Sequence, residues 1–187
     1  WGYDVSLLEF TAAIVSLIGV YLGTTGKQIT WPWWVASSAL YAIWFYQAKY
    51  YGSFATQFIF IGFGIWGWFG WGPKGVKPRK SHTKERISLV AILIVSSLAI
   101  WPLLINIGAT SSAIESFGFV GSVIAQLLMI WQRYEAWPLW VIVDLAYTYQ
   151  YLKGDLYLTS FLYLIFTGIA VWGWVRWQRE SEKFKID

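Results

Sequence analysis

A single acidic side chain lies deep inside a stretch that is otherwise suited to lipid. Asp144 stands near the middle of an apolar and aromatic segment, residues 137–153. A charged side chain at the centre of a bilayer is costly, so such residues usually mark a binding site or a transport pathway. This carboxyl group could pair with a cationic ligand or accept hydrogen bonds from hydroxyl groups. The alternative is that it bonds to Trp or Tyr donors and ties helices together; we favour the binding role.

Aromatic residues share a helix face with this carboxyl group. At about 100° per residue, five side chains form one narrow stripe: Trp137, Trp140, Asp144, Tyr147 and Tyr151. Indole and phenol faces attract flat, electron-poor rings and above all cations, by about 0.5–2 kcal/mol per contact. The stripe therefore predicts a site for a ring-shaped ligand that carries a positive charge.

The first half of the chain repeats this pattern at a constant offset. Residues 6–71 align with residues 112–177 without a gap, and 18 of the 66 paired positions are identical. The counterpart of the stripe is Trp31, Trp34, Ser38, Tyr41 and Phe45. A duplicated membrane unit is typical of transporters that bind their substrate between the two copies. We therefore expect the two stripes to face each other and to enclose an aromatic chamber with one carboxylate.

Two further amides and two further indoles are candidates for the same chamber. Gln57 and Gln126 lie in the middle of predicted helices and could bind ribose hydroxyls or a carboxamide. They could equally hold helices together, a role worth about 0.6–2 kcal/mol. Trp68 and Trp174 lie on the same helix faces as Gln57 and Tyr163, respectively. Four other tryptophans fit an aromatic belt at the membrane surface: Trp66, Trp71, Trp172 and Trp177.

The composition is that of an all-α integral membrane protein. Of 187 residues, 57% are hydrophobic and 13% are charged, whereas soluble domains average about 25% charged residues. A spanning helix needs roughly 20 mainly apolar residues. Seven segments qualify: 6–24, 32–51, 53–71, 88–107, 113–131, 137–153 and 156–176. The spacings Ser6-x-x-Glu9 and Ser112-x-x-Glu115 predict capping boxes, which we favour over a role for these glutamates in transport.

The positive charges predict the orientation. Residues 73–86 carry six Lys or Arg against one Glu, and the positive-inside rule places such a loop in the cytoplasm. The N-terminus is then outside and the C-terminus inside, and 12 of the 14 basic residues face the cytoplasm. A nucleic-acid or partner site in this loop is the weaker interpretation.

This topology gives a 3+1+3 plan with parallel repeats. The predicted parts are a first three-helix repeat (1–72), a basic cytoplasmic loop with a linker helix (73–111), a second three-helix repeat (112–178) and a cytoplasmic tail (179–187). Both repeats enter the membrane from the same side, as in SWEET-type carriers. The linker helix makes that possible and is predicted to have no chemistry of its own.

Several classes of function are not expected. Cysteine is absent and His82 is the one histidine, so thiolate catalysis, Cys-based metal sites and His-rich zinc sites are excluded. No GxxxxGK(S/T) loop for ATP occurs, and no cofactor is expected. A membrane-embedded enzyme would need paired acid and base groups. Proton symport is the first rival to passive transport, with Asp144 as its sole candidate.

The two copies WPWWVASSALY…GFGIWGWFGW and WPLWVIVDLAY…GIAVWGWVRW resemble the PnuC family of bacterial vitamin transporters along the whole chain. The family carries a WxxW motif and a following polar residue in each half. The resemblance implies uptake of nicotinamide riboside across the inner membrane, with relatives for thiamine, riboflavin and deoxynucleosides. It also implies facilitated diffusion, made one-way by phosphorylation in the cytoplasm, and a homotrimer.

The motif positions carry over residue by residue. Trp31 and Trp34 match the first WxxW, and Trp137 and Trp140 match the second. The following polar place, often Asn in the family, holds Ser38 in the first copy and Asp144 in the second. An acidic residue there favours a cationic ring, the pyridinium of nicotinamide riboside or the thiazolium of thiamine, over neutral riboflavin. We expect nicotinamide riboside, with another vitamin or a SWEET-like sugar carrier as alternatives.

Overall fold

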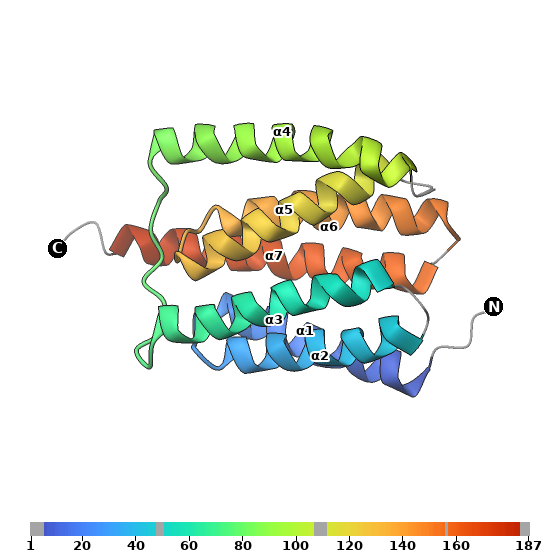
Figure 1. Ribbon diagram of the computed structural model, residues 1–187. Helices are drawn as coiled ribbons and strands as arrows, with labels where there is room; N and C mark the ends of the chain where they lie inside the picture. The colour runs from blue at the N-terminus through green and yellow to red at the C-terminus, as the bar shows by residue number, and fades with distance from the viewer. Residues whose placement is uncertain (1–5, 48–50, 107–111, 156, 184–187) are drawn as a thin grey trace. The chain divides into compact units, whose positions relative to one another are not determined.

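The described residues of the computed structural model, 6–47, 51–106, 112–155 and 157–183, form seven α-helices (Figure 1). The helices match the seven predicted segments, and the all-helical class is confirmed. The longest, at the C-terminal end, continues past the predicted boundary because Arg, Gln, Glu and Lys are good helix formers. The helices are α1 (Leu7–Thr24), α2 (Thr30–Gln47), α3 (Tyr51–Trp71), α4 (Thr83–Asn106), α5 (Ser112–Ile130), α6 (Ala136–Lys153) and α7 (Tyr157–Lys183).

The helices fall into two compact units, Trp1–Val76 and Lys77–Asp187. In the first unit, α2 contacts both α1 and α3. In the second unit, α6 contacts both α5 and α7, and α4 packs against α5. In the described parts of the chain, no Cα atom of α5 lies within 8 Å of one of α7, and the same is true of α1 and α3. Each repeat is therefore built around its middle helix, which carries the aromatic stripe.

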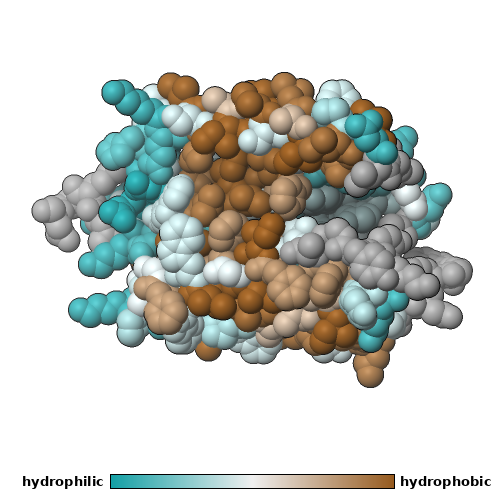
Figure 2. All heavy atoms as spheres, in the orientation of Figure 1, coloured by the Kyte–Doolittle hydropathy of each residue, from teal (hydrophilic) through white to brown (hydrophobic). Residues whose placement is uncertain are grey.

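Four described helices are long and apolar enough to cross a membrane: α1, α4, α5 and α7. The other three are rich in Trp, Tyr, Gly and polar residues, which score lower than aliphatic residues on hydropathy scales. None of the described residues of α4 is buried, and Figure 2 shows apolar side chains over its surface. A helix that exposes apolar side chains all round is typical of contact with lipid.

The N-cap half of the first predicted capping box is present at α1. Ser6 is the N-cap residue, and its Oγ accepts a hydrogen bond of 3.1 Å from the backbone N–H of Glu9. The side chain of Ser112 lies outside the described residues. Its predicted partner, Glu115, instead accepts a bond of 3.2 Å from Nε2 of Gln150. In the second repeat this glutamate therefore joins α5 to α6.

A tryptophan packed on a glycine forms the core of each unit. The ring of Trp31 lies so close to Gly67 that a Cβ added at this glycine would be 2.3 Å from the ring. A Cβ added at Gly173 would likewise be 2.7 Å from the ring of Trp137. Both rings are buried, at 0% and 1% exposure. The glycine is the central residue of the W-G-W sequence in each repeat, so the duplication preserves a close helix approach.

The same cores correct the predicted aromatic belt. Trp71 packs edge-on against Trp31, with ring centroids 4.8 Å apart, and Trp177 packs against Trp137 at 5.6 Å. Trp71 and Trp177 are buried, so their assignment to the membrane surface is wrong. Their edge-to-face geometry is the one that aromatic quadrupoles favour. Trp66 and Trp172 are about half exposed, at 48% and 49%, as a belt requires.

Two residues of the basic loop bond to equivalent turns of the two repeats. Within the first unit, the N–H of Val76 donates to the carbonyl of Gly26 at 2.8 Å. Within the second, the N–H of Arg79 donates to the carbonyl of Gln132 at 2.9 Å. Gly26 and Gln132 are paired in the repeat and both have positive φ, 66° and 59°. Each repeat therefore offers the loop the same left-handed turn.

Candidate functional site

The carboxyl group of Asp144 lies in the middle of α6 and is buried, with 6% of the residue exposed. Its backbone carbonyl accepts a bond of 2.7 Å from Oγ1 of Thr148. Within the described part of the chain, the side chain itself makes no hydrogen bond or ion pair. A buried carboxyl group without a partner is unfavourable. The interpretation that this residue only ties helices together therefore gains no support among the described contacts.

Three tyrosines, two on α6 and one on α7, form a cluster that begins one helical turn after Asp144. The rings of Tyr147 and Tyr151 stack, with centroids 6.0 Å apart. Tyr163 of α7 lies 5.3 Å from the first ring and 5.2 Å from the second. Tyr163 was not among the predicted site residues, although its repeat partner, Gln57, was. A comparison of paired positions could have found it.

The two tryptophans of the second WxxW motif have different surroundings. Trp137 is fixed between Gly173 and Trp177 and is almost fully buried. Trp140, one turn further on, is half-buried. The first tryptophan therefore supports the fold of the unit, and the second has the surface that a ligand could stack on. Trp137 stays a predicted site residue with a clear packing role.

The stripe occupies the face of α6 that lies between its two neighbours. Tyr147 packs over Gly118 of α5, where a Cβ would be 2.4 Å from the ring, and Trp137 packs over Gly173 of α7. At about 100° per residue, Trp140 and Asp144 fall between these two directions. The Cα atoms of the described parts of α5 and α7 do not approach within 8 Å of each other, so the stripe lies between two helices that each pack on α6.

The first unit repeats this arrangement on α2. Trp34 packs edge-on against Trp31 at 5.1 Å and lies over Gly19 of α1, where a Cβ would be 2.5 Å from the ring. Tyr41 and Phe45 stack at 6.0 Å with 29° between the rings, the geometry of their counterparts in α6. Ser38 is half-buried in the polar place of the motif.

The remaining candidates divide by burial. Gln126 of α5 is buried, at 5% exposure, and its amide makes no hydrogen bond among the described residues, so an interhelical bond is not what holds it there. Gln57 of α3 is half-buried. Trp68 and Trp174 are more open, at 36% and 37% exposure. Of the predicted set in the second unit, Asp144 and Gln126 are buried polar side chains without a hydrogen bond among the described residues. The buried indole N–H of Trp137 likewise has none there.

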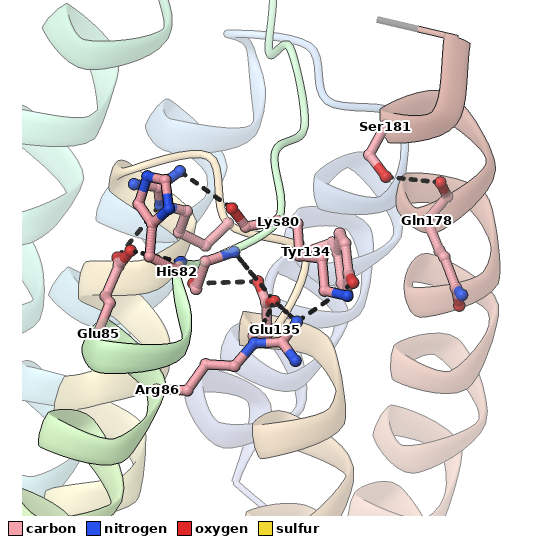
Figure 3. Close-up of polar contacts among 10 residues, drawn as sticks. Lys80, His82, Glu85, Arg86, Tyr134, Glu135, Gln178 and Ser181 are labelled. Carbon is pink, nitrogen blue, oxygen red and sulfur yellow. Dashed lines mark hydrogen bonds and ion pairs between the residues drawn. The ribbon is translucent and has the colours of Figure 1, made fainter. Parts of the chain in front are cut away.

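A separate polar cluster holds the basic loop to the second unit (Figure 3). The carboxylate of Glu135 accepts bonds from the N–H and Oγ of Ser81, at 3.0 and 3.1 Å, and pairs with Arg86. Arg133 pairs with Glu85 at 3.2 Å. Glu85 also accepts a bond from the N–H of His82, which caps the start of α4. We call these six residues the polar clasp.

The polar clasp shows that the basic loop is more than a topology signal. Two of the arginines at this end are neutralised by glutamates, and the loop is held as a defined structure. The clasp joins α4 to the turn between α5 and α6, so the linker helix is fixed to the second repeat at both the clasp and the α4–α5 contact. Within the described residues, no group of His, Asp or Glu is arranged to hold a metal ion.

Comparison with known proteins relates the whole chain to one family. The model of the family described as nicotinamide mononucleotide transporter matches residues 6–179. The nicotinamide riboside transporter PnuC of Escherichia coli K12 is 25% identical over 213 residues, which cover 96% of this chain and 89% of that protein. The riboflavin/roseoflavin transporter RibM of Streptomyces davaonensis is also 25% identical, over 199 residues, covering 92% and 87%.

A solved structure has the same fold. The crystal structure of the vitamin B3 transporter PnuC superposes with a TM-score of 0.77 and 21% identity, covering 92% of this chain and 80% of that one. At this identity the likeness concerns the fold. It agrees with the expected architecture at the level of an all-helical membrane transporter.

Proposed function

The chain belongs to the nicotinamide mononucleotide transporter family, as a multi-pass transporter of the bacterial inner membrane, and we propose that its substrate is nicotinamide riboside. The observation that carries the proposal is the buried, unpaired carboxyl group of Asp144 beside the half-buried ring of Trp140. Nicotinamide riboside has a pyridinium ring with a fixed positive charge. That ring could stack on the indole and pair with the carboxylate in one pose.

The polar parts of the substrate have candidate partners in the second unit. The buried amide of Gln126 has both a donor and an acceptor, as a carboxamide or a ribose hydroxyl needs. Tyr147 and Tyr151 add a phenol face beside the carboxyl group. Binding would supply partners to the carboxyl group of Asp144 and the amide of Gln126, which make no hydrogen bond among the described residues. Pairing of buried polar groups by the ligand is the usual source of specificity at a polar site.

We also propose the finer architecture that the sequence predicted. Seven spans in a 3+1+3 plan, parallel repeats, an outer N-terminus and an inner C-terminus are supported by the duplicated cores and by the charge of the 73–86 loop. Transport would proceed by alternating access and facilitated diffusion, without a cofactor. The family resemblance supports a homotrimer.

Riboflavin is the second candidate, because a riboflavin/roseoflavin transporter matches as closely in identity as the nicotinamide riboside transporters do. Its isoalloxazine ring is neutral, so an acidic residue in the polar place of the motif gives it no advantage. The two candidates therefore differ in how much they depend on the charge of Asp144.

The test is ligand binding to detergent-purified protein by calorimetry. The ligands are nicotinamide riboside, its reduced form, in which the ring is neutral, thiamine and riboflavin. We expect Asp144→Asn to weaken the charged form about tenfold, which corresponds to about 1.4 kcal/mol, and the reduced form far less. Asp155→Asn, at the exposed end of α6, is the matched control and should change neither. Equal losses for the two forms would refute the pairing role, and preferred binding of riboflavin would replace the proposed substrate.

A further inference from the structure

The last helix is longer than a membrane requires. α7 has 27 residues, which at about 1.5 Å per residue span about 40 Å. The hydrocarbon core of a bilayer is about 30 Å thick, enough for roughly 20 residues. If α7 enters the core at Tyr157, it leaves the core near Arg176. The last two turns of the helix then lie at and beyond the lipid headgroups.

Those last turns carry a basic stripe. Trp172, Arg176, Arg179 and Lys183 have the spacing i, i+4, i+7, i+11, which places them on one face of the helix. Together with Val175 and Glu180 they line a shallow groove of about 250 Å³. We call this the α7 groove. It has an indole at its inner end and three cationic side chains beyond.

The charges of the α7 groove are only partly neutralised. Arg176 and Glu180 form an i,i+4 pair at 3.4 Å, with side chains 36% and 31% exposed. Such an exposed pair is weak and is open to competition. Among the described residues, Arg179 and Lys183 make no ion pair. Three cations and one carboxylate leave the groove with a net charge of +2, which suits an anion.

An apolar path on the same helix face leads to this groove. Phe161 and Ile165 are exposed, at 60% and 37%, and lie on the same face as the basic stripe. Between them and Trp172 stands Gly168, where an added Cβ would meet nothing within 4 Å. The helix surface therefore has an open apolar notch at Gly168, one turn before the indole, where the backbone is not covered by neighbouring side chains.

From this order of apolar notch, indole and cations we infer that this face of α7 binds an anionic phospholipid. The phosphate group would be held by Arg176, Arg179 and Lys183, since guanidinium and ammonium groups are strong donors to phosphate oxygens. Trp172 would lie at the boundary between hydrocarbon and headgroups, where tryptophan is enriched. One acyl chain would pass over Gly168. A free phosphate ion would bind the same cationic side chains but would not occupy the notch at Gly168.

The experiment is native mass spectrometry of the full chain released from detergent that contains equal amounts of phosphatidylglycerol and phosphatidylcholine. We expect retained phosphatidylglycerol to fall about fivefold or more in the variant R176Q/R179Q/K183Q. The matched control R79Q/K80Q/K84Q removes the same number of charges from the basic loop of the same unit and should keep the lipid. Gly168→Leu fills the notch without touching a charge and should also weaken retention.

Three results would overturn the inference. Equal loss in the two triple variants would show attraction to net charge without a site. Equal retention of phosphatidylglycerol and phosphatidylcholine by the unaltered chain would show that the headgroup charge is not recognised. Displacement of the lipid by inorganic phosphate at constant ionic strength, with no effect of Gly168→Leu, would show a site for a free anion. Far-ultraviolet circular dichroism of each variant verifies that it remains folded.

Discussion

Replacing the glycine under the core tryptophan should destabilise each unit, and the chain offers a matched control for each replacement. An Ala Cβ at Gly173 would lie 2.7 Å from two ring carbons of Trp137, whereas carbon atoms pack best at about 3.5–4.0 Å. The ring or the helix must therefore move by about 1 Å. The ring has no free space to move into, because it is 1% exposed and packs against Trp177.

The size of the effect follows from two opposing contributions. Overpacking of a buried site costs about 1–3 kcal/mol. The exchange of Gly for Ala in a helix returns up to about 1 kcal/mol in water, and less where the helix is already formed in the membrane before it packs. We therefore expect Gly173→Ala to lower the free energy of unfolding by about 1–2 kcal/mol, and Gly67→Ala, with its closer approach of 2.3 Å, by at least as much.

The assay is unfolding of detergent-purified variants by titration with sodium dodecyl sulfate, followed by circular dichroism. Gly168→Ala and Gly62→Ala are the controls, because an added Cβ meets nothing within 4 Å at either position; both should be neutral or slightly stabilising. The double variant with Trp137→Phe should recover part of the loss at Gly173, since a smaller ring leaves room for the methyl group. Equal stability of Gly173→Ala and Gly168→Ala would refute the packing argument.

Three other predictions concern the site and the clasp. Trp140→Ala should weaken binding of nicotinamide riboside by about 0.5–2 kcal/mol in calorimetry and should change the free energy of unfolding little. Trp137→Ala should lower the free energy of unfolding by about 3–5 kcal/mol. Equal effects of the two variants on stability would contradict their separate roles. Glu135→Gln should cost about 1–3 kcal/mol in the same unfolding titration, because Arg86 loses a charged partner, and the exposed Glu182→Gln should cost nothing. Uptake into proteoliposomes should not respond to an imposed pH gradient; faster uptake with inward protons would favour symport.

The helices were predictable because their signals are local. Apolar stretches of about 20 residues and tight turns fix where helices begin and end, and a constant offset shows the repeat without any structure. The end of α7 was predicted at 176 and lies at Lys183, since the boundary of apolar residues marks the lipid and not the end of hydrogen bonding. Helix-forming charged residues extend a helix beyond the membrane.

The errors concern which neighbour a side chain meets. Trp71 and Trp177 were placed in an aromatic belt by composition and position, yet the structure buries them against Trp31 and Trp137. Periodicity tells which residues share a face of one helix, but not whether that face meets lipid or protein in an aromatic-rich chain. For the same reason, the bond between Glu115 and Gln150, 35 residues apart, had no signal in the local spacing.

The polar clasp could not be predicted from the sequence. Arg86 and Glu135 are 49 residues apart, and Arg133 and Glu85 are 48 apart, so no helical or strand period relates them. The buried but unpaired state of Asp144 was also beyond the sequence, which shows only that an acidic residue lies among apolar ones. The residue types in the sequence predict which chemical groups the site contains. Only the three-dimensional structure shows which of these groups have hydrogen-bond or ion-pair partners.

The two repeats have equivalent left-handed turns at Gly26 and Gln132 but are not interchangeable, and these turns show why. In the first repeat, a Cβ at Gly26 would lie 2.1 Å from Cγ1 of Val76, so only a residue without a side chain fits. In the second, Oε1 of Gln132 accepts a bond of 2.8 Å from the N–H of Lys77, so a side chain is needed despite its positive φ. A chain rearranged to begin with the second repeat would bring each turn to the wrong end of the loop. The different residues at the equivalent positions Gly26 and Gln132 therefore fix which repeat precedes the basic loop and which follows it.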